Sequence, residues 1–110
     1  MDQPVNFDNL REITGGDLAL ESELFRNFIA SSAACLEGLR GAMAGGDEGE
    51  WRKHAHALKG VCLNLGADAL GGLCKKAQED YRATGEEKRL ILCDIEGELA
   101  RVQAALEPHL

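Results

Sequence analysis

No proline interrupts the chain between Pro4 and Pro108. Proline fixes φ and removes a backbone donor, so a proline-free interior of this length can form uninterrupted helices. Apolar residues recur through it at intervals of three and four, a spacing typical of amphipathic helices. No segment alternates with a period of two, and we therefore expect no β-strand.

Glycines and helix-capping residues divide this interior into five expected helices. Asp8 is expected to cap a short first helix that runs to Thr14. Asp47 is expected to cap a later helix, with Glu50 three residues on in the position of a capping box. The expected bounds are 8–14, 17–44, 48–65, 68–83 and a last helix that begins at residue 86.

Four long amphipathic helices joined by short loops are typical of a helix bundle. We therefore predict an all-α fold: an antiparallel up-down-up-down four-helix bundle with a short extra N-terminal helix. The chain has 110 residues, and we expect it to form a single domain over residues 1–110.

The charge balance and the apolar pattern exclude several classes of protein. Acidic residues outnumber basic ones by 19 to 12, giving a net charge of -7, so we expect no nucleic-acid partner. No apolar run approaches the ~20 residues of a membrane span, and no basic-flanked apolar segment opens the chain. We expect a cytoplasmic protein with no membrane partner.

The four cysteines are far apart in the sequence and form no C-x-x-C pair. They are Cys35, Cys62, Cys74 and Cys93, each within a helical apolar pattern. We expect them to be small buried hydrophobic residues in a reducing compartment rather than a disulfide framework.

The segment "WRKHAHALKG", residues 51–60, carries two histidines on opposite sides of one expected helix. At about 100° per residue, His54 lies about 40° from Leu58 and His56 about 160° from it. We expect His54 to border the core and His56 to face water. Two histidines at i and i+2 cannot share a metal ion, and we expect no metal site. The core face around Leu58 consists of Trp51, Ala55, Leu58, Cys62 and Leu65.

The expected neighbours of His56 suit a nucleophile that receives negative charge. Arg52 and Lys59, at i-4 and i+3, are placed to offset charge on the ring. Gly60 costs about 1 kcal/mol of helix stability against alanine, which makes sense if a side chain there would block an approaching group. Leu63 offers an exposed apolar contact, and Lys53 lies at the flank. A largely neutral imidazole near pH 7 has a ring nitrogen free to attack phosphorus.

Gln78 is a candidate partner for the His56 ring. If the helices on either side of Gly66-Ala67 run antiparallel, residues whose numbers add to about 133 lie level with one another. Gln78 could then reach across and fix the tautomer of the ring, or it could be an ordinary surface amide. Geometry alone leaves both alternatives open.

The segment "HALKGVCLNLGA", from His56 to Ala67, resembles the histidine-containing phosphotransfer (HPt) domain of multistep phosphorelays. Trp51 upstream and Leu73-Cys74 downstream extend the resemblance to nearly the whole chain. Its specific residues are His56, Leu58, Lys59 and Gly60, supported by Asn64, Gly66 and Ala67. The chain departs from the usual pattern at Val61 and Cys62, where a small serine or alanine pair is common, and at Gly71-Gly72, which weakens the following helix.

The resemblance implies a helical bundle in which His56 accepts a phosphoryl group from a receiver-domain aspartate and passes it to another. Lys59 would offset the phosphate charge, Gly60 would leave room for the receiver, and Gln78 would hydrogen-bond the histidine. The implied receiver-docking residues are Arg52, Lys53, Gly60, Leu63 and Asn64.

The implied partners are response-regulator receiver domains, a hybrid histidine kinase, or both. We expect the protein to be a monomer without a cofactor of its own, with Mg²⁺ supplied on the partner receiver. The chain has no Gly-rich nucleotide loop, so we expect a phosphotransfer intermediate without ATP-dependent kinase activity.

Two other classes remain as alternatives. The first is a non-catalytic adaptor bundle that binds a partner through the Leu63 face, with His56 idle. The second is a metal or haem bundle, which would need inward-facing Glu-x-x-His sets that this sequence lacks.

Overall fold

The computed structural model describes residues 3–110, and among them it has helices and turns but no strand. The all-helical prediction is confirmed. The elements are α1 (Phe7–Thr14), α2 (Leu18–Gly45), α3 (Glu48–Leu65), α4 (Asp68–Glu79), α5 (Gly85–Leu106) and a final 3₁₀ turn, η1 (Glu107–His109).

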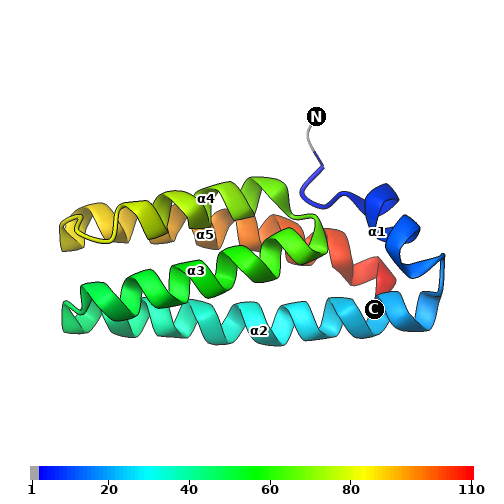
Figure 1. Ribbon diagram of the computed structural model, residues 1–110, viewed down its shortest axis with the longest axis horizontal. Coiled ribbons are helices and arrows are strands. Elements are labelled where there is room, and N and C mark those ends of the chain that lie inside the picture. Colours follow the sequence, from blue (N-terminus) through cyan, green and yellow to red (C-terminus); the bar gives the residue numbers. More distant parts are fainter. Residues whose placement is uncertain (1–2) are drawn as a thin grey trace.

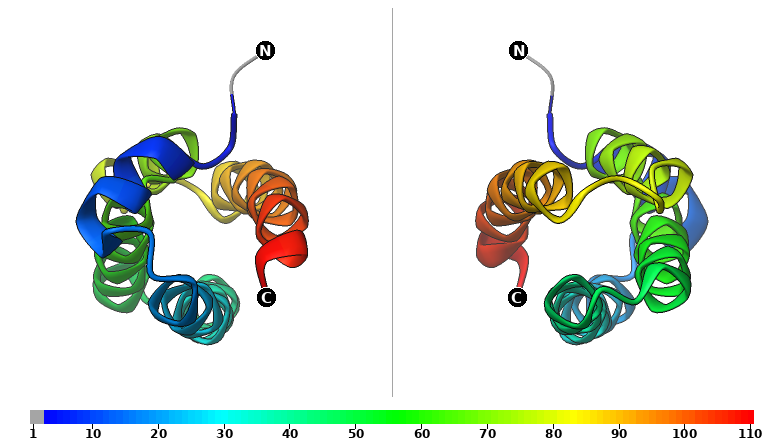
Figure 2. Two further views of the ribbon diagram at one scale, coloured as in Figure 1. Left: turned by 90° about the vertical axis from the view of Figure 1, so that its right-hand side faces the viewer. Right: turned by 90° about the vertical axis from the view of Figure 1, so that its left-hand side faces the viewer.

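Four helices, α2 to α5, lie side by side along the long axis of the molecule (Figure 1). At 1.5 Å per residue the 28 residues of α2 span about 42 Å, close to the 43 Å length of the whole molecule. Viewed end-on, the four helices surround a common interior, and α1 lies across one end (Figure 2). No helix within residues 3–110 is long and apolar enough to cross a membrane.

The long helices begin and end where local chemistry satisfies their free backbone groups. Asp17 caps α2 by accepting from the Leu20 N–H at 3.1 Å, and Asp47 caps α3 through the Glu50 N–H at 3.0 Å. Gly66 ends α3 with φ of 83°, a left-handed conformation that a side chain would oppose. The predicted bounds of α3 are confirmed.

Three boundary predictions were wrong. Asn6, not Asp8, caps α1: its Oδ1 accepts from the Asn9 N–H at 3.1 Å, and Asp8 lies within the first turn. The helix predicted over 68–83 ends at Glu79, so Tyr81 lies in the turn that follows. The last helix begins at Gly85 rather than at residue 86, because Thr84 caps it through a reciprocal capping box with Glu87.

The predicted core face of α3 is confirmed, and Trp51 is its largest member. Trp51 is fully buried, and its Nε1 donates to the Ala77 carbonyl on α4 at 2.8 Å. This bond satisfies the only polar group of the indole, so the ring can lie in an apolar interior. The other fully buried side chains of the bundle include Phe25, Leu39, Leu58, Leu70, Ile95 and Val102.

The cysteine prediction holds for two of the four residues. Cys62 and Cys74 are buried, whereas Cys35 is half-buried and Cys93 is exposed on α5. All four are free thiols. A hydrogen bond with the Cys74 thiol, together with burial, raises the pKa of the Cys62 thiol. Burial likewise raises the pKa of Cys35. These thiols are therefore protonated near neutral pH, as expected of packing residues.

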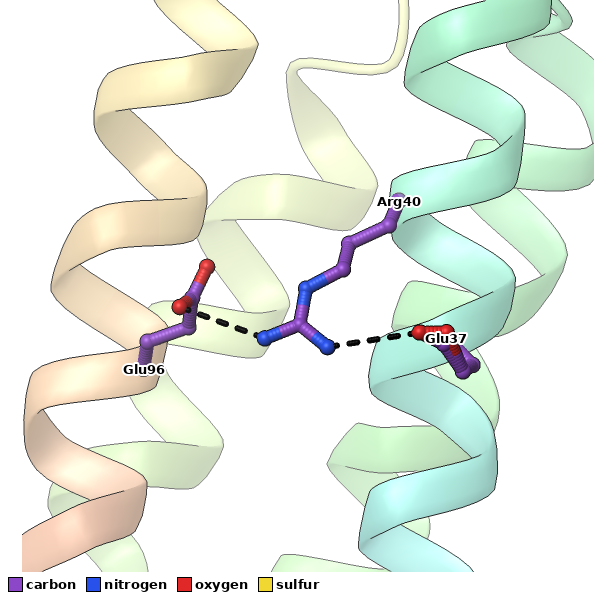
Figure 3. Close-up of polar contacts among 3 residues, drawn as sticks. All are labelled: Glu37, Arg40 and Glu96. Atoms are coloured by element: carbon purple, nitrogen blue, oxygen red, sulfur yellow. Dashed lines mark hydrogen bonds and ion pairs between the residues drawn. The ribbon is translucent and has the colours of Figure 1, made fainter.

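Arg40 connects α2 to α5 on the surface of the bundle (Figure 3). Its guanidinium lies 3.3 Å from Glu96 on α5 and 3.4 Å from Glu37 one turn away on α2. Exposed pairs of this kind contribute about 0–1 kcal/mol each. The pairing therefore helps to orient the two helices, and apolar burial supplies most of the stability.

Residues near both ends of the described chain pack against the bundle. Val5 is fully buried, and the Asn6 N–H donates to the Gly66 carbonyl at the end of α3. The His109 ring packs on Phe7 with ring centroids 4.6 Å apart, so this histidine near the end of the chain is held against α1. The sequence gives no sign of this contact, because Phe7 and His109 are about a hundred residues apart.

Candidate functional site

The structure places the two histidines of α3 in different environments. His56 is exposed on the face opposite the core, and His54 is half-buried at the core margin. Both positions agree with the helical-wheel prediction. Within the described residues, no group of three or more His, Cys, Asp and Glu side chains is arranged to hold a metal ion.

His54 is held in place by two neighbours. Its Nε2 lies 3.2 Å from the Glu50 carboxylate, one turn earlier on α3. The Glu50 carboxylate also lies 4.0 Å from Lys53. The ring packs so closely against Gly38 of α2 that a Cβ at that position would overlap the imidazole. His54 therefore has a packing role between α2 and α3.

His56 is contacted by the side chain of Gln78 from α4. Its Nδ1 lies 3.3 Å from the Gln78 Oε1. An amide oxygen can only accept, so this contact is a hydrogen bond when Nδ1 carries the proton. The neutral tautomer with its proton on Nδ1 has its lone pair on Nε2, the ring nitrogen farther from the backbone. Of the two alternatives for Gln78, the structure has the contact rather than a free surface amide.

The cationic side chains near His56 differ in exposure. Arg52 and Lys53 are exposed, whereas Lys59 is half-buried, less open than its predicted place on the outer face. A half-buried lysine packs its methylene stem on apolar neighbours while its ammonium group stays near water. Lys59 is thus held more firmly against α3 than a freely solvated lysine.

Gly60 leaves open space on the helix beside His56. A Cβ at this position would meet nothing within 4 Å, so packing inside the chain does not require glycine there. Because Gly60 has no side chain, the helix surface does not obstruct the approach of another molecule to the imidazole one turn away. Asn64, one turn further on, is also exposed.

Leu63 is 54% exposed and leans toward α4. A Cβ on Gly71 would lie 3.2 Å from the Leu63 Cδ2, tighter than an ordinary contact. Gly71 is buried. Because it has no side chain, the Leu63 side chain can lie over α4 at this position, although glycine lowers the stability of the helix.

A shallow hollow of about 200 Å³ lies between α1, α2 and the C-terminal half of α3. Sequence reasoning did not find it, because it depends on which residues of α2 face α3. Leu24, 37% exposed, contributes apolar surface from α2, and Asn64 and Val61 contribute from α3. The remaining lining residues are Leu10, Asn27, Phe28, Ser31 and Leu65.

Tyr81 brings two arginines together beside the His56 face, and this too was not predicted. The Arg52 Cζ lies 5.0 Å from the centre of the Tyr81 ring, and the Arg82 Cζ lies 5.1 Å from it. Both distances are within the range of a cation–π contact. Tyr81 itself lies in the turn after α4, where it is half-buried and packs against the hydrophobic core.

Comparison with known proteins gives a family and a structure. The family model of the Hpt domain matches residues 23–105. The crystal structure of histidine-containing phosphotransfer protein B (HptB) from Pseudomonas aeruginosa PAO1 is similar, with a TM-score of 0.84 and 26% sequence identity. The match covers 98% of this chain and 95% of that one. No curated protein matches the chain significantly.

Proposed function

Because the chain belongs to the Hpt domain family and so has a histidine phosphotransfer role in a phosphorelay, we propose that His56 is its phosphoacceptor. In the proposed step, Nε2 attacks the phosphorus of a receiver aspartyl phosphate. The N–P bond forms as the acyl P–O bond breaks, and the aspartate leaves as a carboxylate. The reverse reaction on a second receiver returns the phosphoryl group to an aspartate.

One observation carries this assignment: His56 is exposed, and its Nδ1 is within hydrogen-bonding distance of Gln78. Gln78 favours the tautomer whose Nε2 lone pair is directed away from the backbone. His54 is the competing histidine, but its Nε2 is occupied by Glu50 and its ring is packed against Gly38. Gln78 is accordingly the residue that orients the nucleophile.

The local charge supports the same assignment. The chain is acidic overall, with a net charge of -7, yet Arg52, Lys53 and Lys59 gather around His56. Phosphoryl transfer depends on positioning and on neutralising charge more than on covalent chemistry by the protein. Lys59 is proposed to offset the phosphoryl charge.

The receiver is proposed to dock over the exposed face of α3 around His56. The docking residues would be Arg52, Lys53, Gly60, Leu63 and Asn64, with Gly60 leaving room for the receiver surface. The hollow beside Asn64 would extend this contact toward α2.

Hpt domains work with receiver domains and histidine kinases, and they are phosphotransfer intermediates rather than kinases. For this chain we propose response-regulator receivers, a hybrid histidine kinase, or both as partners. Mg²⁺ would be bound by the receiver, and the chain itself would need no cofactor. We propose that it acts as a cytoplasmic monomer without ATP-dependent activity.

The proposed scaffold is a single domain over residues 1–110, an antiparallel up-down-up-down four-helix bundle. Two side-chain contacts support opposite directions for α3 and α4. His56 pairs with Gln78, and Arg52, one turn earlier in α3, pairs with Tyr81, further along the chain. In this arrangement α4 and the turn after it hold the residues that orient the active face of α3.

Incubation with a phosphorylated receiver tests the function. We expect the protein to acquire label from a ³²P-labelled receiver, and the label to be lost in acid and kept in alkali, as expected of an N–P bond. Label that is lost in alkali would place the phosphoryl group on a carboxylate and contradict the proposal. No label from any competent cognate receiver would favour the adaptor alternative.

Lys59→Ala is expected to slow transfer about tenfold to a hundredfold, because one charged contact to the phosphoryl group is lost. Stopped-flow or rapid-quench transfer from the phosphorylated receiver measures this effect. The bundle should keep its helical circular dichroism, since the ammonium group is not part of the core.

Arg26→Ala is the control, because it removes the same charge from an exposed position on α2. Its transfer rate is expected to stay within about twofold of the wild type. Equal slowing in the two variants would mean that net charge, rather than Lys59, determines the rate.

A further inference from the structure

We propose that Tyr81 is a positioning residue whose ring holds the guanidinium groups of Arg52 and Arg82 for contact with an acidic receiver surface. This inference rests on the proposed function of His56. It gives Tyr81, which lies outside the histidine motif, a role in the affinity for the partner.

The geometry places the two arginines on one aromatic side chain. Arg52 comes from α3 and Arg82 from the turn after α4, and their Cζ atoms lie 5.0 and 5.1 Å from the Tyr81 ring centre. Tyr81 is half-buried, so its ring is less mobile than either exposed arginine. Each contact attracts a cation to the ring, and the two together gather two positive charges that would otherwise repel one another.

These contacts lie next to the proposed phosphoacceptor. Arg52 precedes His56 by one helical turn on the same face of α3. Tyr81 follows Gln78 by three residues, so the Arg52–Tyr81 and His56–Gln78 contacts are neighbours along the α3–α4 interface. The Tyr81 ring and its two arginine contacts therefore lie about one helical turn from the His56–Gln78 contact, toward the N-terminal end of α3.

Both guanidinium groups remain available to a partner. Within residues 3–110, neither Arg52 nor Arg82 has a carboxylate within ion-pair distance. An arginine has large side-chain entropy, which it loses when it is fixed on binding. Contact with the Tyr81 ring removes part of this cost in advance.

The charge of the chain indicates what these arginines meet. With a net charge of -7, the chain as a whole repels an acidic partner, and the basic side chains of Arg52, Lys53 and Lys59 near His56 oppose that repulsion locally. The proposed receiver presents an aspartyl phosphate and would hold its Mg²⁺ with carboxylates, which together would form an acidic rim. Arg52 and Arg82 are placed to meet that acidic rim, so we expect Tyr81 to affect docking more than the chemical step.

Transfer kinetics of Tyr81→Leu and Tyr81→Phe test this inference. Tyr81→Leu is expected to raise KM for the phosphorylated receiver about threefold to tenfold at low salt, as exposed cation–π contacts are weak individually. Its kcat should be unchanged, and the KM difference should shrink at high salt. Tyr81→Phe keeps the aromatic face and should restore the wild-type KM. An unchanged KM in Tyr81→Leu, or a lowered kcat at unchanged KM, would overturn the inference.

Arg52→Gln provides a second measurement that does not depend on how Tyr81→Leu folds. It should raise KM in the wild-type background and add little in the Tyr81→Leu background, because both changes remove the same interaction. Independent, multiplicative effects would contradict the positioning role.

Labelling by phosphoramidate separates the two proposals. This small donor needs no docking surface, so wild type and Tyr81→Leu should be labelled at the same rate. A slower rate in Tyr81→Leu would mean that Tyr81 acts on the histidine itself. If neither phosphoramidate nor a receiver labels the wild type, the function proposed for His56 fails. If the wild type is labelled but the KM for the receiver does not change in Tyr81→Leu, only the role proposed for Tyr81 fails.

Discussion

His56→Gln is expected to abolish acid-labile labelling by a phosphorylated receiver, a loss of at least about a hundredfold. Glutamine has similar reach and polarity, but its amide nitrogen has no lone pair free to attack phosphorus. Because the residue is exposed and its partner is another side chain, the substitution should change the free energy of unfolding by less than about 0.5 kcal/mol. Autoradiography after acid and alkali treatment measures the label, and urea unfolding measures stability.

His54→Gln is the matched control, since it makes the same chemical change two residues away. We expect this variant to keep its label and to lose stability, because the His54 ring packs against Gly38 and contacts Glu50. The opposite pattern, with label kept in His56→Gln and lost in His54→Gln, would show that the phosphoacceptor had been assigned to the wrong side of α3.

The sequence predicts well which side chains of α3 face the core and which face water, because the helix has a fixed angular repeat. Once Trp51, Ala55 and Leu58 are placed on one face, the wheel sets the directions of both histidines. The same geometry brings Gln78 level with His56 when the two helices are antiparallel. The directions of His56 and His54 therefore follow from spacing alone, whereas spacing leaves two alternatives for Gln78 and the structure supplies its contact with His56.

Helix ends were less predictable, because several polar residues compete for the same free backbone groups. Asn6 and Asp8 are both suitable N-cap residues. Asn6 lies just before the first turn and accepts from the Asn9 N–H, so it is the cap. Thr84 and Gly85 are as suited to end one helix as to begin the next. The two reciprocal hydrogen bonds between Thr84 and Glu87 make Thr84 the N-cap of α5.

The surface around His56 depends on how the helices pack against one another, and this packing could not be predicted from the sequence. Nothing in the sequence relates Leu24 to Val61, because the register between α2 and α3 is set by close packing such as that of His54 against Gly38. Tyr81 packs against the core, as its spacing from Cys74 and Ala77 favours, but the early end of α4 also brings its ring into contact with Arg52 and Arg82. A one-turn error in a helix end thus hid a neighbour of the candidate site.

Trp51 links the core to that site, and Trp51→Ala is expected to have the largest effect on stability. The side chain is fully buried, and its loss should lower the free energy of unfolding by about 3–5 kcal/mol. The Nε1 bond to Ala77 would also be lost, and Ala77 directly precedes Gln78. The buried Lys88 would lose the indole ring that now lies 5.3 Å from its ammonium group.

Trp51→Phe separates the two contributions of the indole. Phenylalanine keeps most of the apolar volume but leaves the Ala77 carbonyl without its donor, at a cost of about 1–3 kcal/mol. Urea unfolding followed by circular dichroism measures both variants. If the Ala77 bond keeps Gln78 beside His56, we expect folded Trp51→Phe to be labelled more slowly than the wild type. An unchanged labelling rate in the folded variant would show that α4 holds Gln78 in place without that bond. A loss in Trp51→Ala no greater than that in Trp51→Phe would contradict a core role for the ring, because the hydrogen bond alone would then account for the whole effect.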